Sequence, residues 1–98
     1  MSYDGGVSER EYRWDDEAKI GRPDAPVSRP EVIQALYSPL RQEVLIEDQL
    51  LYVYGPADSG RLIFVVADRF VTGINTFVIT RARYASDSER RDWERRTR

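Results

Sequence analysis

The sequence predicts an α+β fold: an antiparallel meander of four to five strands, with one helix before it packed on a face and a second helix at the C-terminus. Three observations lead to this prediction. Residues 42–84 consist of strand-like apolar runs joined by short turns. Helix start signals flank this region at Ser28 and Ser86. The length of 98 residues, 41% of them hydrophobic, suits a single domain with a modest core.

The segment before the first helix is expected to hold little regular structure. Residues 1–11 mix Gly, Ser and charged residues without periodicity, so we expect a mobile N-terminal tail, followed by one domain over residues 12–98. Residues 12–15 read Y-R-W-D and fit a short strand with both aromatic side chains on one side. Two prolines then predict a loop over residues 21–26.

A helix is expected at residues 28–38, because S-R-P-E at residues 28–31 has the spacing of a capping box. Val27 and Val32 are placed as the hydrophobic staple that often accompanies such a box. Apolar residues then recur at helical spacing on one face. The helix should end at residues 38–39, where Ser-Pro disfavours the helical conformation.

The strands follow this helix. A polar turn at residues 47–49 and a Gly-rich turn at residues 55–60 separate the first three strands. The run at residues 61–67 is apolar after its first residue, which favours a central strand covered on both faces. The expected strands are Val44–Ile46, Leu50–Tyr54, Arg61–Ala67 and Thr76–Tyr84.

Composition excludes several classes of function. The chain has no His and no Cys, so disulfide frameworks and zinc sites built on Cys or His are excluded, and we expect no metal and no other cofactor. No apolar run approaches the roughly 20 residues of a membrane span, so we expect a cytoplasmic protein without a membrane partner. Any chemistry must then depend on Arg, Lys, carboxylates and hydroxyl groups.

Positive charge is concentrated in the second part of the chain. Residues 1–60 contain 6 basic and 12 acidic side chains, while residues 61–98 contain 9 basic and 5 acidic ones, which gives net charges of -6 and +4. Fourteen of the 15 basic residues are Arg. This bias favours bidentate recognition of phosphate or carboxylate groups, and a GC-rich genome would produce the same bias.

The last strand carries the basic residues of greatest interest. Strict alternation would put Phe77, Ile79, Arg81 and Arg83 on one face, so that this face changes from apolar to basic along its length. Arg81 and Arg83 would lie roughly 7 Å apart, close enough to hold two neighbouring anionic oxygens. The alternative is that these arginines are solvated or paired with acids on the next strand, such as Glu43 or Glu47.

The terminal helix has two interpretations. Oppositely charged residues four positions apart, such as Arg90 and Glu94, are typical of a solvated helix, and each such pair contributes only about 0.2–0.5 kcal/mol. Trp93 is the main apolar anchor, with support from Tyr84 and Ala85. A tryptophan among arginines could instead stack on a nucleic-acid base.

Five motifs in the chain follow the order of a known family. They are W-D at 14–15, V-S-R-P-E at 27–31, G-R-L-I-F-V-V at 60–66, R-A-R at 81–83 and E-R-R-D-W-E at 89–94. Together they resemble the BrnT-type toxins of bacterial type II toxin–antitoxin modules, relatives of the RelE-like ribonucleases. The resemblance covers about residues 12–96. The Lys-His-Gly that commonly precedes the V-S element is replaced by D-A-P at residues 24–26.

The resemblance implies a curved antiparallel sheet flanked by helices, and a toxin that cleaves RNA until its cognate antitoxin neutralises it. Arg83 and Glu89 match the strand-end Arg and the helix Glu of the family, and Arg61 matches the Arg after the turn. Lys19 lies one place from the family's early Lys.

The expected mechanism is metal-independent: the RNA 2′-hydroxyl attacks the adjacent phosphate, and Arg81, Arg83 and Arg61 stabilise the developing negative charge. Glu89 or Tyr84 would move protons. The RNA would be bound by Lys19, Arg90 and Arg91, which hold its backbone, and also by Tyr84.

Two other functions stay open. The chain could be a catalytically inactive binding module of the same fold that pairs with an antitoxin or another protein, which the absence of His favours. It could also be an unrelated small scaffold that assembles through a sheet edge or through Trp93. A homodimer and a hetero-oligomer with the antitoxin are both compatible with the sequence.

Overall fold

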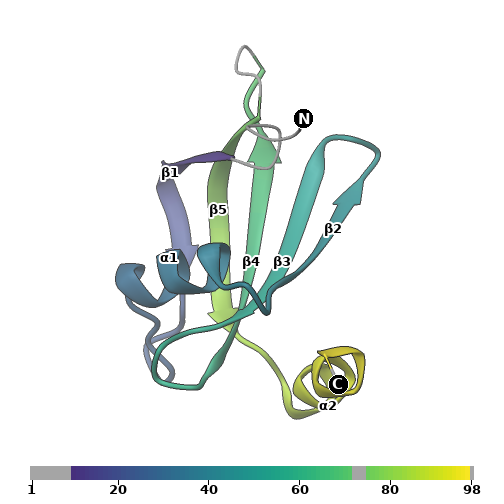
Figure 1. The fold of residues 1–98 in the computed structure, drawn as a ribbon. Coiled ribbons are helices and arrows are strands. Elements are labelled where there is room, and N and C mark those ends of the chain that lie inside the picture. The colour runs from purple at the N-terminus through teal and green to yellow at the C-terminus, as the bar shows by residue number, and fades with distance from the viewer. Residues whose placement is uncertain (1–9, 72–74, 98) are drawn as a thin grey trace.

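A computed structural model describes residues 10–71 and 75–97 of the chain (Figure 1). It contains a five-stranded mixed sheet and two helices, so the fold is α+β. The elements are β1 (Glu11–Ile20), α1 (Arg29–Tyr37), β2 (Gln42–Ile46), β3 (Leu50–Pro56), β4 (Leu62–Arg69), β5 (Thr76–Tyr84) and α2 (Asp87–Thr97). Most of the tail expected at residues 1–11 lies outside the described residues, and Glu11 already belongs to β1.

The strand order is β1-β5-β4-β3-β2. The predicted antiparallel meander is confirmed for β2 to β5, whereas β1 pairs parallel with β5, so the prediction is wrong for that strand. β1 is also longer than the strand expected at residues 12–15. The path of the chain permits this parallel direction, because α1 and three other strands separate β1 from β5 and no hairpin joins the two.

Helix α1 begins where the sequence predicts. The Ser28 hydroxyl accepts a hydrogen bond from the Glu31 amide at 3.3 Å, and the Glu31 carboxylate accepts one from the Ser28 amide at 3.0 Å, which completes the capping box. The helix packs against β3 and β4. Its backbone comes so close to β3 that a Cβ atom on Gly55 would lie 2.2 Å from the carbonyl oxygen of Ala35, so this contact requires glycine.

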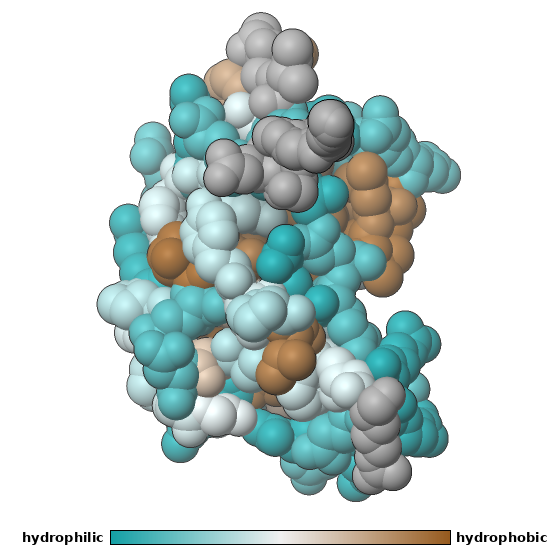
Figure 2. Space-filling model, in the orientation of Figure 1, coloured by the Kyte–Doolittle hydropathy of each residue, from teal (hydrophilic) through white to brown (hydrophobic). Residues whose placement is uncertain are grey.

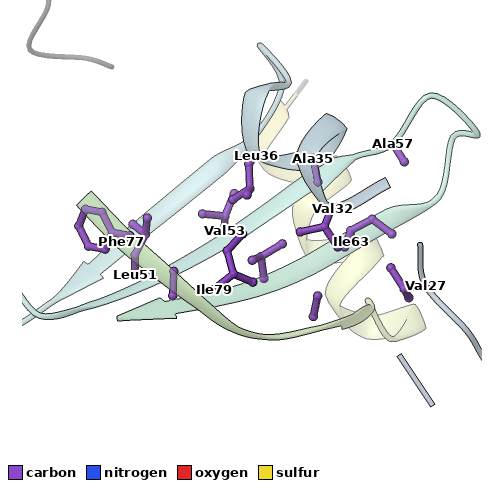
Figure 3. Close-up of a cluster of buried hydrophobic side chains, with 13 residues drawn as sticks. Val27, Val32, Ala35, Leu36, Leu51, Val53, Ala57, Ile63, Phe77 and Ile79 are labelled. Atoms are coloured by element: carbon purple, nitrogen blue, oxygen red, sulfur yellow. The ribbon is translucent and has the colours of Figure 1, made fainter. Parts of the chain in front are cut away.

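The hydrophobic core fills the space between α1 and the near face of the sheet (Figure 3). Val32 and Leu36 reach down from α1, and Val53, Ile63 and Ile79 reach up from three neighbouring strands. Each of these side chains is at most 1% exposed, and burial of one such side chain contributes about 1.5–3 kcal/mol. The centre of the sheet is therefore the rigid support for both of its faces.

A β-bulge in β5 changes the predicted alternation of side chains. Ile79 pairs with Ala67 and Arg81 with Val66, so Thr80 is an extra residue in β5. The prediction that Phe77, Ile79, Arg81 and Arg83 share one face is therefore wrong. Phe77 and Ile79 lie in the core, and the extra residue turns Arg81 and Arg83 to the opposite face.

Helix α2 is held to the sheet by few contacts. Its predicted capping box is present, because the Glu89 carboxylate accepts from the Ser86 amide at 2.7 Å and the Ser86 hydroxyl accepts from the Glu89 amide at 3.2 Å. None of its described residues is buried. Trp93 anchors it by donating from its indole N–H to the carbonyl of Leu40 at 3.2 Å. Gln42 donates to the carbonyl of Trp93.

Helices α1 and α2 are the only helices in the described part of the chain, and neither has the length and apolar character needed to cross a membrane.

Candidate nucleic-acid interface

The sheet face opposite α1 holds an open groove of about 480 Å³. Odd-numbered residues of β3 and β4 point into the core, so the even-numbered ones point into the groove. Tyr52, Tyr54, Phe64 and Val66 make its floor. β5 and α2 supply Arg81, Arg83 and Glu89 from the strand-to-helix join at residues 81–89, and β4 supplies one further charged residue, Asp68.

Among the described residues that line this groove, Arg81 is the cation that has no ion-pair partner. Its side chain is exposed, and within the described residues it makes no hydrogen bond or ion pair. Lys19 of β1 lies directly beside it in the cross-strand register, and paired residues of neighbouring strands share a face. Two positive charges, neither of them with an ion-pair partner in the described part of the chain, are therefore presented together at this side of the sheet.

Arg83 lies next to Arg81 on the same face, but it is fixed by Glu89. Its two terminal nitrogens donate to the two oxygens of the Glu89 carboxylate at 2.8 and 3.0 Å. The guanidinium also lies 4.6 Å from the centre of the Phe64 ring, within the range of a cation–π contact. Arg83 thus keeps one orientation while Arg81 is free to move.

The alternative that the strand-end arginines pair with Glu43 or Glu47 is wrong for Arg83. Its acidic partner comes from α2 and not from the neighbouring strand. Glu43 is bound by Arg10 and by Arg41, the latter at 2.5 Å. Among the described residues, Glu47 makes no ion pair and lies in the β2–β3 turn.

The Arg83–Glu89 pair also sets the ionisation of its surroundings. The hydrogen bonds from Arg83 lower the pKa of Glu89 to about 2, so this carboxylate is charged at neutral pH. Tyr54 donates its hydroxyl to Glu89 at 2.8 Å. Burial, together with this bond, raises the pKa of Tyr54 to about 12. Glu89 and Tyr54 therefore keep fixed protonation states near pH 7.

Aromatic rings cover most of the groove floor. Tyr54 stacks on Phe64 with ring centres 4.6 Å apart, and Tyr52 meets Phe64 edge to face at 5.4 Å. Tyr52 is half-buried and, among the described residues, its hydroxyl group has no hydrogen-bond partner. The ring of Tyr52, beside two arginines, can accept the face of a nucleic-acid base.

Arg61 and Tyr84 lie on the other side of the sheet. Tyr84 packs against the core, and its hydroxyl donates to the Glu31 carboxylate of α1 at 3.4 Å. The Arg61 guanidinium lies over the Tyr84 ring at 4.7 Å. These two residues therefore form a separate cluster at the start of α1, and the structure does not bring them together with Arg81.

Arg90 and Arg91 point away from the groove. Arg90 donates to the carbonyl of Gly60 at 3.0 Å, so it holds α2 against the β3–β4 turn. Arg91 is exposed and lies in a separate shallow hollow on α2. Of the eight residues that the sequence singles out, Arg81, Arg83 and Glu89 line the groove and Lys19 lies at its border.

Sequence reasoning missed the aromatic floor and one carboxylate. Tyr52 and Tyr54 are two residues apart on a strand whose odd-numbered residues are apolar, and this alternation could have placed both on the face away from the core. Asp68 lies farther along the groove, and among the described residues its side chain has no partner. The position of Asp68 in the groove could not have been predicted without the register of β4.

Comparison with known proteins adds no assignment: no protein-family model matches the chain, and no curated protein matches its sequence. Within the part of the chain that the structure describes, acidic side chains do not gather in a group of three or more that could hold a metal ion.

Proposed function

We propose that this protein is a ribonuclease toxin of the BrnT type, which binds single-stranded RNA in the groove and is neutralised in the cytoplasm by a cognate antitoxin. The observation that carries the proposal is the position of Arg81 and Arg83, side by side on an open sheet face next to Tyr52 and Phe64. Adjacent arginines suit phosphate oxygens, and the half-buried ring of Tyr52 suits an unpaired base.

The groove supports a defined mode of binding. Arg81 and Arg83 are two residues apart on one strand, which corresponds to roughly 7 Å, so they contact neighbouring phosphate oxygens. Lys19 extends the positive surface along the backbone. A base next to the bound phosphate stacks on Tyr52, and such stacking contributes about 1–3 kcal/mol per base.

The reaction is an internal transfer of the phosphate. The RNA 2′-oxygen forms a bond to phosphorus while the bond from phosphorus to the 5′-oxygen breaks, which leaves a 2′,3′-cyclic phosphate and a new 5′-hydroxyl. Arg81 and Arg83 stabilise the extra negative charge on the non-bridging oxygens in the transition state. The 2′-hydroxyl proton passes to water, and water protonates the 5′-oxygen.

Glu89 has a positioning role in this proposal. Its pKa of about 2 makes it a very weak base near pH 7, so it does not take the proton from the 2′-hydroxyl. By holding both terminal nitrogens of Arg83, it keeps that guanidinium over the Phe64 ring at the groove floor. Arg61, Tyr84, Arg90 and Arg91 take no direct part, because they lie outside the groove.

One observation favours a second candidate, an inactive binding module that recognises RNA or an antitoxin. Glu89 and Tyr54 have pKa values of about 2 and about 12, so neither exchanges a proton readily at neutral pH. Such a groove binds a phosphate backbone without strong acid–base assistance to cleavage.

Incubation of the purified protein with a single-stranded RNA oligonucleotide in excess chelator separates the two candidates. A ribonuclease gives fragments that end in 2′,3′-cyclic phosphate, and a 2′-deoxy sugar at the cleaved position stops the reaction while leaving binding intact. Binding of both oligonucleotides without any cleavage supports the inactive module. Absence of both binding and cleavage at low salt would refute a function in RNA recognition.

A further inference from the structure

Strand β2 leaves one edge of the sheet uncovered. It is the last strand in the order β1-β5-β4-β3-β2, and no described strand pairs with its outer side. Its large apolar residues are unusually exposed: Val44 is 48% exposed, and Leu45 and Ile46 are each 38% exposed. Figure 2 shows an apolar patch on the side of the molecule where Figure 1 places the β2–β3 hairpin.

This edge lacks the usual protection against pairing. Natural edge strands are commonly blocked by lysine, proline or an unpaired charge. β2 reads Q-E-V-L-I and contains neither lysine nor proline. Its single charged residue, Glu43, is already bound by Arg10 and Arg41. Within residues 10–71 and 75–97, no strand pairs with the outer side of β2, and we infer that this side can pair with another strand.

Two antiparallel copies of β2 can pair without placing like charges opposite each other. In one continuous sheet, residues that lie opposite each other on paired strands point to the same face. Side chains alternate between the two faces along β2, so a two-fold axis between two copies of β2 must pass through a residue and not between two residues. An axis through Glu43 would oppose two glutamates, and an axis through Leu45 would oppose Glu43 to Glu47. An axis through Val44 opposes Val44 to itself and Arg41 to Glu47, which avoids like charges.

We propose that a second copy of this chain pairs with β2, antiparallel and with its two-fold axis at Val44. The two sheets then form one continuous sheet, and both RNA-binding grooves lie on the same face of it. The exposed valine, leucine and isoleucine side chains of β2 become covered across the axis. This dimer depends on the edge of the sheet and not on RNA binding.

The oligomeric state tests the proposal directly. Sedimentation velocity over a range of protein concentrations should show a dimer for the unsubstituted chain. Val44→Lys places two positive charges opposite each other at the axis and should give a monomer with unchanged circular dichroism. Val71→Lys is the matched control, because Val71 is 94% exposed and outside β2, and it should leave the dimer intact. A monomer at all concentrations, or a dimer that survives Val44→Lys, would overturn it.

A cysteine scan tests the register, since the chain has no native cysteine. Opposed residues of antiparallel strands have Cα atoms about 4.5–5.5 Å apart, which a disulfide can bridge. Val44→Cys should therefore give a covalent dimer under mild oxidation. Leu45→Cys should not, because the predicted register sets its two copies about 8 Å apart. Preferential cross-linking of Leu45→Cys would refute the register.

Discussion

Arg83 of β5 and Glu89 of α2 bind each other through two hydrogen bonds of 2.8 and 3.0 Å, and this pair joins the sheet to the terminal helix. Since α2 has no buried residue among those described, its position depends strongly on such polar contacts. The pair also orients the one guanidinium that lies over Phe64 in the groove.

Removal of the side chain of either Arg83 or Glu89 should loosen the attachment of α2 to the sheet more than it disturbs the sheet itself. Arg83→Ala and Glu89→Gln should each lower the free energy of unfolding by about 1 kcal/mol, a modest value because water screens the partly exposed Arg83. The double variant should lose less than the sum of both effects. Urea unfolding of the four proteins measures the coupling, and strict additivity would mean that the two residues do not interact.

Stability should fall in acid through this pair. The pKa of Glu89 is about 2 in the folded protein and 4.5 ordinarily, so folding favours the charged form. Its contribution is complete above about pH 4.5 and is lost as the pH falls toward about 2. The difference in melting temperature between the unsubstituted chain and Glu89→Gln should shrink over this window. A difference that is the same at all pH values would contradict the lowered pKa.

Gly55→Ala should be among the most damaging small substitutions in the chain. The added methyl group would lie 2.2 Å from a backbone oxygen of α1, so the helix must move away from β3, at a cost of about 3 kcal/mol. Gly60→Ala is the comparison, because it meets no atom within 4 Å and suffers only from its φ of 90°. Chemical unfolding should rank Gly55→Ala as clearly less stable than Gly60→Ala. Equal losses would show that α1 does not press on this position.

The ring of Tyr52 should contribute directly to RNA binding. Tyr52→Ala removes the ring available for stacking and should weaken binding to single-stranded RNA by about tenfold. Tyr37→Ala removes a ring of the same kind that is 58% exposed and belongs to α1, so it should leave affinity unchanged. Fluorescence anisotropy with a labelled oligonucleotide measures both. Equal affinities for the two variants would exclude stacking at Tyr52.

Local signals predicted much of the fold. Both capping boxes form as their S-x-x-E spacing requires, and β5 has the predicted bounds of Thr76 and Tyr84. Such features depend on residues three or four positions apart, which the sequence displays directly. The parallel pairing of β1 depends instead on contacts between distant segments, and no local motif reports it.

The sequence predicted only part of the candidate site, because the rest depends on contacts between distant segments. Arg81 and Arg83 do share a face, but the extra residue Thr80 places that face away from the core. A bulge is set by the pairing of β5 with β4, so strict alternation could not reveal it. The Arg83–Glu89 pair brings together a strand end and a helix start, and only the path of the chain between them fixes that contact.

The rate at which Arg81→Ala forms 2′,3′-cyclic phosphate from single-stranded RNA tests the role of the groove most directly. Arg81 is exposed and without a partner among the described residues, so the substitution should change stability by no more than about 0.5 kcal/mol. The rate should fall roughly 100-fold, because one charge that stabilises the transition state is lost. Arg95→Ala, which removes the same charge from a position 68% exposed on α2, should keep the full rate. Equal rates for Arg81→Ala and the unsubstituted protein would contradict catalysis in the groove.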